Sequence, residues 1–320
     1  MIVSSPVTQF AADVARDLQR TPKQLQPQYF YDALGSQLFE AICRLPWYAI
    51  AVAEEVLLRQ RAPEMFSRLL SGGRGDVCLI ELGVGSGEKM ATFLRGLPST
   101  ARARVHLVDI SPSALAEASA RLAQFANVVV DCHPGTYERG LHAVATVASA
   151  DPRLVLFLGS NIGNFDREGA ASLLRAIRNT LRPGDQLLLG ADLIKPADTL
   201  TLAYDDPLGV TAAFNKNLLL RINHELGGTF DLAAFDHQAI WNGPEQRVEM
   251  HLVSRKAQTV SIPAAGIDVA FAAGESIWTE SSYKYTEAEL ARLARDVGFG
   301  IGDPWIEPSA KFALVLFEAS

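Results

Sequence analysis

The chain has 320 residues, and with 48% hydrophobic side chains it can form a sizeable core, so we expect two domains or one domain with a large insertion. The 36 acidic residues outnumber the 29 basic ones, giving a net charge of −7, and no basic cluster is interleaved with aromatic residues; both features argue against a nucleic-acid partner. Three scattered cysteines in no metal-ligand spacing, no charged-then-apolar leader and no apolar run of membrane-spanning length predict a reduced, zinc-free protein of the cytoplasm with no membrane partner.

Strands and helices are predicted to alternate after a first segment, residues 1 to about 60, that is mainly helical. Alternation of this kind is typical of a Rossmann-like α/β fold, a parallel sheet with helices on both faces. Ser111 with Pro112, and Asp166, are expected to begin two of the helices, and Pro183 with Gly184 to end the last. The expected strands are 77–82, 104–109, 127–131, 154–159 and 186–191, and the expected helices are about 88–96, 112–125, 137–148 and 166–181.

The first of these strands runs into a glycine-rich turn. Gly83, Gly85 and Gly87 let the backbone turn sharply and approach a ligand that a Cβ would block. This G-x-G-x-G pattern is shared by the dinucleotide fingerprint and the first motif of S-adenosylmethionine-dependent methyltransferases, and Glu81 just before it favours the second. Asp109, at the end of the next strand, is placed to accept hydrogen bonds from ribose hydroxyls in either cofactor.

Amide side chains follow the fourth strand. Ligands of open α/β sheets bind beyond the carboxyl ends of the strands, so Glu81, Asp109, Asp131 and either Asn161 or Asn164 are expected to point into one crevice. Amides there suit an amine or carboxylate substrate. An isolated asparagine at such a place is equally typical of a turn.

Residues 196–285 interrupt the alternation and read as a small α+β module. A helix is predicted over Val210–Leu226, ended by Gly227, with strands at 247–254, 258–262 and 268–272. The alternation resumes with a helix over 286–297, for which Thr286 and Glu289 form a capping box, and a strand over 312–318.

Six segments, in order across nearly the whole chain, resemble one family: the histidine-specific, S-adenosylmethionine-dependent Nα-methyltransferases of ergothioneine biosynthesis. The glycine motif is common to many methyltransferases, whereas Y-D-x-x-G-S and Y-D-D…F-N-x-N are far more particular. The segments are Pro22–Tyr48, E-L-G-V-G-S-G-E-K, F-L-G-S-N-I-G-N-F, Tyr204–Asn217, R-V-E-M-H-L and Ile277–Tyr285.

The resemblance implies S-adenosyl-L-methionine as cofactor and three successive methylations of the α-amino group of L-histidine, giving the betaine hercynine. It implies a cofactor domain of residues 61–195 and 286–320, a substrate-binding insertion of 196–285 to which 1–60 contribute, and a small amino-acid partner; we expect a monomer. The implied cofactor-binding residues are Glu81, Gly83, Gly85, Lys89, Asp109, Thr136 and Tyr137. The implied substrate-binding residues are Tyr48, Asn164, Tyr204, Met250, Glu280 and Ser282, with Tyr31 as the catalytic candidate that orients the amine.

In that family Asn164 and Tyr204 correspond to the groups that hold the substrate carboxylate, and Glu280 and Ser282 to those that hold the imidazole. The residues support the second pair independently, because an acid and a hydroxyl two positions apart in an extended segment share one face. Glu280 could also be an exposed acid at a strand edge, and Tyr204 a half-buried turn aromatic.

Two departures from the family pattern bear on the substrate. Ala49-Ile50-Ala51-Val52 stands where the family commonly has Y-P-T-R, over the active site, and Thr136 stands where it usually has Asp. Another amino acid or amine, for example a tryptophan-like one, is therefore an alternative substrate, and a cofactor-binding homologue without catalysis is a third possibility. The six histidines show no H-x-x-x-H or H-x-H pairing, so no metal site is expected, and His106 is expected in the sheet.

Overall fold

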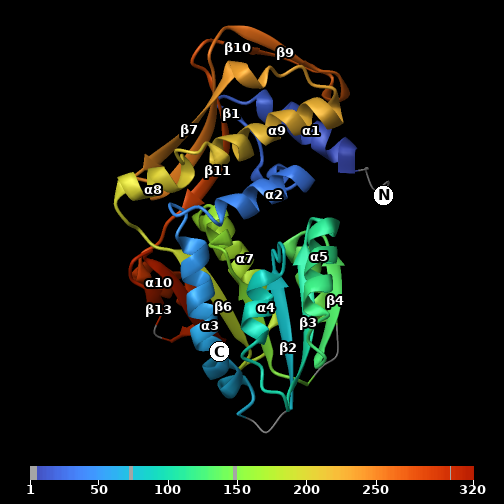
Figure 1. The fold of residues 1–320 in the computed structure, drawn as a ribbon, viewed down its shortest axis with the longest axis vertical. Coiled ribbons are helices and arrows are strands. Elements are labelled where there is room, and N and C mark those ends of the chain that lie inside the picture. Colours follow the sequence, from blue (N-terminus) through green and yellow to red (C-terminus); the bar gives the residue numbers. More distant parts are fainter. Residues whose placement is uncertain (1–5, 72–74, 147–149, 303) are drawn as a thin grey trace. The chain divides into compact units, whose positions relative to one another are not determined.

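The computed structural model of the protein describes residues 6–71, 75–146, 150–302 and 304–320 (Figure 1). The chain divides into two compact units. We call the first, Met1–Tyr48 with Lys195–Ser282, the insertion unit, and the second, Ala49–Ile194 with Tyr283–Ser320, the sheet unit. Among the described helices, none combines the length and the apolar character needed to cross a bilayer.

The described strands of the sheet unit form an eight-stranded sheet in the order β12-β14-β6-β5-β2-β3-β4, with β13 also paired to β14. The strands from β2 to β6 are parallel, whereas β14 runs antiparallel to β6. This confirms the Rossmann-like methyltransferase fold. The strands are β2 (Asp76–Leu82), β3 (Arg102–Asp109), β4 (Val128–Pro134), β5 (Arg153–Phe157), β6 (Gln186–Asp192), β12 (Phe299–Ile301), β13 (Trp305–Glu307) and β14 (Phe312–Ala319).

Helices cover both faces of this sheet. On one face α4 packs against α3 and α5, and on the other α7 packs against α6 and α10 over a continuous apolar core. The predicted caps are confirmed: Ser111 Oγ accepts from Ala114 N, Asp166 Oδ1 accepts from Gly169 N, and Thr286 forms the expected capping box. The helices are α3 (Ile50–Leu69), α4 (Glu88–Leu94), α5 (Pro112–Leu122), α6 (Tyr137–Ala145), α7 (Arg167–Thr180) and α10 (Glu287–Asp296); residues 147 and 148, predicted to extend α6, lie outside the described residues.

The insertion unit contains a four-stranded sheet, β1-β11-β8-β7, and a hairpin of β9 and β10. Helix α9 begins at Val210 and ends at Leu226 as predicted, and Gly227 ends it in the left-handed conformation (φ 67°). The elements are α1 (Pro6–Leu18), β1 (Lys23–Gln24), α2 (Ala33–Ile42), α8 (Ala197–Tyr204), α9, β7 (Phe235–Asn242), β8 (Arg247–Ser254), β9 (Gln258–Ile262), β10 (Ile267–Phe271) and β11 (Ser276–Tyr283), with 3-10 turns at Pro27–Phe30, Leu232–Ala234 and Pro263–Ala265.

Residues 49–60, expected in the N-terminal helical segment, cluster with the sheet unit instead. The physical reason is helix α3, which is continuous from Ile50 to Leu69 and packs against α4, β13 and β14. Its buried stripe, including Ala53, Leu57 and Leu58, is thereby covered by elements of the sheet unit.

Candidate active site

The turn after β2 has the backbone that its glycines predict. Gly83, Gly85 and Gly87 all lie in the left-handed region, with φ of 74°, 53° and 77°. Gly83 N donates to Val108 O on the neighbouring strand at 2.8 Å. A Cβ on Gly87 would come within 2.8 Å of Ala118, so this glycine also lets α4 approach α5 closely.

Side chains from two elements, α6 and the turn after β5, converge on Gly83. A Cβ at this position would lie 2.9 Å from Tyr137 Oη and 3.0 Å from Asn161 Nδ2. Tyr137 opens α6 directly after the N-cap Thr136, and its ring packs edge-on against Phe157 at 5.4 Å. Burial raises the pKa of Tyr137 far above its usual value, so the hydroxyl stays protonated and can donate a hydrogen bond.

Asp109 lies at the end of β3 and is tied to the glycine turn. Its Oδ1 accepts from Ser111 N at 2.9 Å and its Oδ2 accepts from Gly85 N at 3.3 Å. Burial raises the pKa of this carboxyl group, and the backbone donors oppose that shift in part. The carboxylate is thus fixed beside the loop, at the strand end where the sequence placed it.

Glu81, the last acid before the turn, is almost completely buried, with 1% of its surface exposed. Its Oε2 has no hydrogen-bond partner among the described residues. Burial raises the pKa of Glu81 to about 8, although the positive charge of Lys89 lowers it. A buried carboxylate oxygen without a partner is costly in a protein, and a positively charged ligand beside it would remove that cost.

Asn164 ends a 3-10 turn, Asn161–Asn164, that follows β5. Ser160 enters this turn at a φ of 56° and its Oγ accepts from Asp192 N at 3.0 Å, while Tyr285 Oη donates to Ile162 O at 3.3 Å. Both asparagine side chains are half-buried. The amides that the sequence singled out therefore lie on a turn that is fixed at its start and at its second residue.

Asp131 does not join this group. The strand β4 continues to Pro134, so Asp131 lies in mid-strand rather than at the strand end, opposite His106 in register. Its Oδ2 accepts from Arg104 Nε at 2.7 Å. The sequence placed Asp131 in the crevice because the predicted strand stopped three residues early.

The insertion unit brings four of its predicted substrate residues together. Tyr204 Oη donates to Ser282 Oγ at 2.7 Å, and the ring of Tyr48 meets that of Tyr204 edge-on at 6.0 Å. Glu280 lies two positions before Ser282 on β11, which confirms the expected extended segment. Burial raises the pKa of Tyr48 well above its usual value, and the negative charge of Glu280 raises it further. Tyr48 is therefore a neutral hydroxyl.

Tyr31 and Met250 lie in the same unit. The Tyr31 ring packs edge-on against Phe39 at 5.7 Å and Phe214 at 5.9 Å, and Phe39 in turn meets Tyr48 at 6.3 Å. Met250 is buried on β8, and its backbone carbonyl accepts from Thr279 on β11 at 3.0 Å.

Residues 10–319 match the profile of the histidine-specific, S-adenosylmethionine-dependent methyltransferases. The chain belongs to this family. The histidine N-alpha-methyltransferases of Mycolicibacterium smegmatis and Mycobacterium tuberculosis are each 40% identical to it over 306 residues, which cover 95% of this chain and 93% of theirs. The L-tryptophan methyltransferase of Psilocybe serbica is 25% identical over 93% of this chain and 89% of its own.

The residues of this methyltransferase fit S-adenosylmethionine. The turn at Gly83 leaves a cradle that a Cβ would fill, and the unpartnered oxygen of Glu81 suits the positive charge of the cofactor. Lys89, expected to bind the cofactor, lies with its Nζ 2.7 Å from Glu54 Oε2. Glu54 was not singled out from the sequence.

The methyltransferase also positions its site through motif residues whose roles the sequence did not reveal. Asp32, in Y-D-x-x-G-S, caps α2 by accepting from Gly35 N at 2.7 Å and also accepts from Asn217 Nδ2, in F-N-x-N, at 2.9 Å. The motif needs glycine at 35, because a Cβ there would collide with Phe30 O. The two family motifs thus bind each other.

His237 is a second such residue. One ring nitrogen, Nε2, lies 2.8 Å from the Tyr204 carbonyl and must donate to it, while Nδ1 lies 2.9 Å from the Asn215 amide nitrogen and must accept. Burial lowers the pKa of His237, which keeps the ring neutral as this pattern requires. A lone histidine in an unpredicted strand, β7, gave no signal in the sequence.

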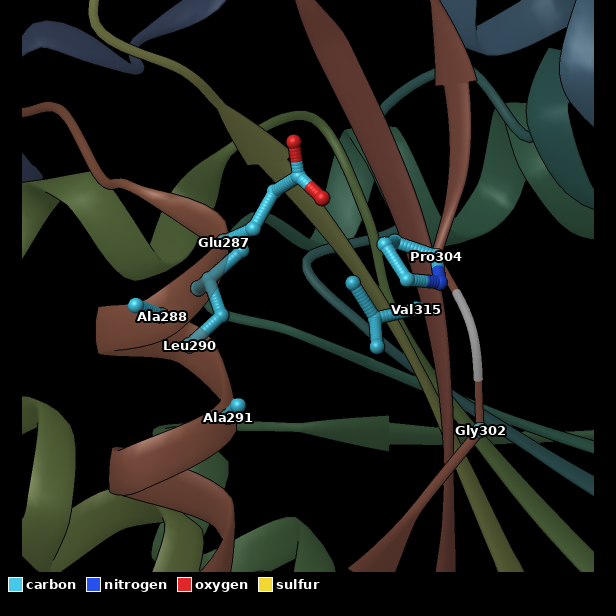
Figure 2. A pocket seen from close by; sticks show the side chains of 7 residues that line it. All are labelled: Glu287, Ala288, Leu290, Ala291, Gly302, Pro304 and Val315. Atoms are coloured by element: carbon cyan, nitrogen blue, oxygen red, sulfur yellow. The ribbon is translucent and has the colours of Figure 1, made fainter.

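A separate hollow of the sheet unit lies between α10 and β14 (Figure 2). Its described lining is small and apolar apart from Glu287, without the several convergent polar groups typical of ligand sites. We assign no function to it. The hollow is lined by Glu287, Ala288, Leu290, Ala291, Gly302, Pro304 and Val315.

Among the described residues there is no cluster of three or more metal-ligating side chains.

Proposed function

We propose that the protein transfers methyl groups from S-adenosylmethionine to the α-amino group of L-histidine, in three successive steps that give hercynine for ergothioneine biosynthesis. The observation that carries this proposal is the Tyr204 to Ser282 hydrogen bond of 2.7 Å beside Glu280 on the same strand. A carboxylate and a hydroxyl on one strand face complement the two nitrogens of an imidazole ring. Two bacterial relatives bear the name histidine N-alpha-methyltransferase.

Methylation of an amine is an in-line attack by its unprotonated form, so most of the barrier reduction comes from positioning. When bound, S-adenosylmethionine supplies the methyl group on a positively charged sulfur. We assign Glu280 and Ser282 to the imidazole, Asn164 and Tyr204 to the carboxylate, and Tyr31 to the amine. Tyr31 orients the amine, and the proton of the amine passes through water to a tyrosine or carboxylate side chain.

The cofactor assignments follow the same logic. Asp109 would accept from the ribose hydroxyls of the cofactor, Tyr137 would contact its adenine, and Glu81 would balance its positive charge. Gly83 and Gly85 supply the backbone surface, and the hydrogen bond from Gly85 N to Asp109 supports a preformed loop. Thr136 begins α6 as its N-cap and takes the place of an acid usual in the family.

The imidazole assignment is tested by the variant Glu280→Ala. We expect the ratio of kcat/KM for histidine over tryptophan to fall by about tenfold or more. A site that recognises a ring N–H through one acceptor discriminates less well between substrates once that acceptor is removed. Ser281→Ala is the matched control, since alternate residues of β11 face opposite sides, and it should leave the ratio within about twofold. Unchanged histidine turnover in Glu280→Ala would sink the assignment.

A tryptophan-like amine is the second candidate substrate. It is favoured by the apolar stretch at Ala49–Val52. In this stretch Ala49 gives α3 no side-chain cap, and Val52 is an apolar side chain that is 57% exposed. The tryptophan methyltransferase relative lends it further support. Turnover of tryptophan at a higher kcat/KM than histidine would establish this alternative.

We further propose that the enzyme works as a monomer in the cytoplasm. In support of the cytoplasm, cysteines 43, 78 and 132 form no disulfide with one another, as is usual in a reducing compartment. Light scattering at the concentrations of the activity assay tests the first point, and a dimer mass there would overturn it.

A further inference from the structure

Glu54 is a charged side chain in the interior of the sheet unit. It lies on the first turns of α3 with 1% of its surface exposed. Its neighbour Glu55 points outward and pairs with Arg59 one turn along the same helix. Burial of a carboxylate is unfavourable by several kcal/mol unless charges or hydrogen bonds compensate it, so the partners of Glu54 deserve a functional explanation.

Those partners come from the loop after β5 and from α4. Gly159 N donates to both carboxylate oxygens of Glu54, at 2.8 and 2.9 Å. Lys89 Nζ lies 2.7 Å from Glu54 Oε2. The carboxylate therefore joins a residue of the glycine-turn helix to the strand end that leads into the Asn161–Asn164 turn.

Two glycines make room for this arrangement. A Cβ on Gly190, on β6, would collide with Glu54 Oε1, and a Cβ on Gly159 would come within 2.7 Å of Lys89 Nζ. Gly159 has a φ of 75°, which also favours glycine. The backbone of β6 and of the β5 loop is thus shaped around the ion pair.

Lys89 is only partly enclosed, with 33% of its side chain exposed, whereas Glu54 is sealed beneath it. Both act electrostatically on Glu81: the positive charge of Lys89 lowers the pKa of Glu81, and the negative charge of Glu54 raises it. Because the Lys89 ammonium pairs with Glu54, it balances the negative charge of Glu81 less completely, and Glu81 is more receptive to a cationic ligand.

We propose that Glu54 is a positioning residue for the cofactor site, holding the Lys89 ammonium and the Gly159 strand end in the geometry that receives S-adenosylmethionine. The inference rests on the proposed assignment of Lys89 to the cofactor. Glu54 acts through Lys89 and touches neither substrate nor cofactor. If instead it only fixes α3 to the sheet, its replacement would act on stability in the same way whether or not Lys89 is present.

A double-mutant cycle separates the two roles, with calorimetric titration of S-adenosylhomocysteine as the readout. Glu54→Gln keeps the shape and an acceptor for Gly159 N but removes the charge. We expect it to weaken binding by about tenfold in the wild-type background and by less than about twofold in Lys89→Met, because contacting residues are coupled. Glu55→Gln, on the exposed side of the same helix, should leave binding unchanged.

Equal weakening in both backgrounds, or none in either, would overturn the proposal. If Glu54→Gln does not fold, Gly190→Ala displaces the same carboxylate without removing its charge and should show the same dependence on Lys89. Thermal unfolding of each variant without ligand reports the structural share. Failure of the wild type to bind S-adenosylhomocysteine would instead contradict the cofactor assignments themselves, so the two failures are distinguishable.

Discussion

Glu81 links the protonation of one buried carboxyl group to the stability of the protein. Its pKa is raised from 4.5 to about 8, chiefly by burial. Without a cofactor, the stability that its neutral form provides is fully present below about pH 4.5 and is lost as the pH rises through about 8.

We therefore expect the free energy of unfolding without ligand to fall as the pH rises from about 6.5 to about 8 and to level off above that, and Glu81→Gln, which cannot ionise, to flatten this decline. His106 does not contribute above about pH 6.5, because its pKa is lowered from 6.5 to about 4 on folding and its effect on stability is confined to the interval between these two values. Urea denaturation at a series of pH values measures the effect. An equally steep decline in Glu81→Gln would contradict the assignment of this titration.

At the residue scale, sequence reasoning worked where one position determines one local geometry. The glycines with positive φ, the caps Ser111, Asp166 and Thr286, and the pairing of Glu280 with Ser282 on one strand are of this kind. It could not identify Glu54, because a glutamate within a helix is usually solvent-exposed and only the tertiary packing of Gly159 and Gly190 shows that this one is buried.

At the scale of elements, the parallel sheet could be predicted because its strands are short apolar runs between clear turns. The strand β7 was missed because polar residues lie on both of its faces. The extended segment around Glu280 was expected, but the bounds of β11 were not predicted. The short β1 pairs in parallel with β11, a contact between segments about 250 residues apart that no local pattern could indicate.

The first turn of α3 contains one of the two departures from the family pattern that the sequence shows. Ala49 gives α3 no side-chain cap, and Ile50 is buried at 6% exposure. Replacing Ala49–Val52 by Y-P-T-R is compatible with the helix. Proline would stand at the first helical position, where the backbone N–H has no partner within the helix and its absence costs no hydrogen bond. We expect preference for histidine over tryptophan to rise by at least about threefold and affinity for S-adenosylhomocysteine to increase.

Steady-state competition between the two amino acids measures this change, with Arg59→Gln, farther along the exposed face of α3, as control. If neither substrate preference nor cofactor affinity moves, the segment has no part in specificity.

At the scale of the molecule, the residues proposed for the site belong to both units. The proposed cofactor residues Glu81, Lys89 and Asp109 belong to the sheet unit, as does the proposed substrate residue Asn164. The proposed substrate residues Tyr204, Glu280 and Ser282 belong to the insertion unit. The sheet unit follows rules shared by many proteins and was foreseeable from βα alternation. The insertion unit is held by interactions such as Asn217 with Asp32, which join distant motifs and follow only from the fold.

The central claim is that histidine is the methyl acceptor, and the most direct test is calorimetric titration of L-histidine into the protein with S-adenosylhomocysteine present, followed by mass spectrometry of the product formed with S-adenosylmethionine. The account predicts that histidine binds and that the final product has gained three methyl groups. Binding of the cofactor analogue without any binding or methylation of histidine would contradict it.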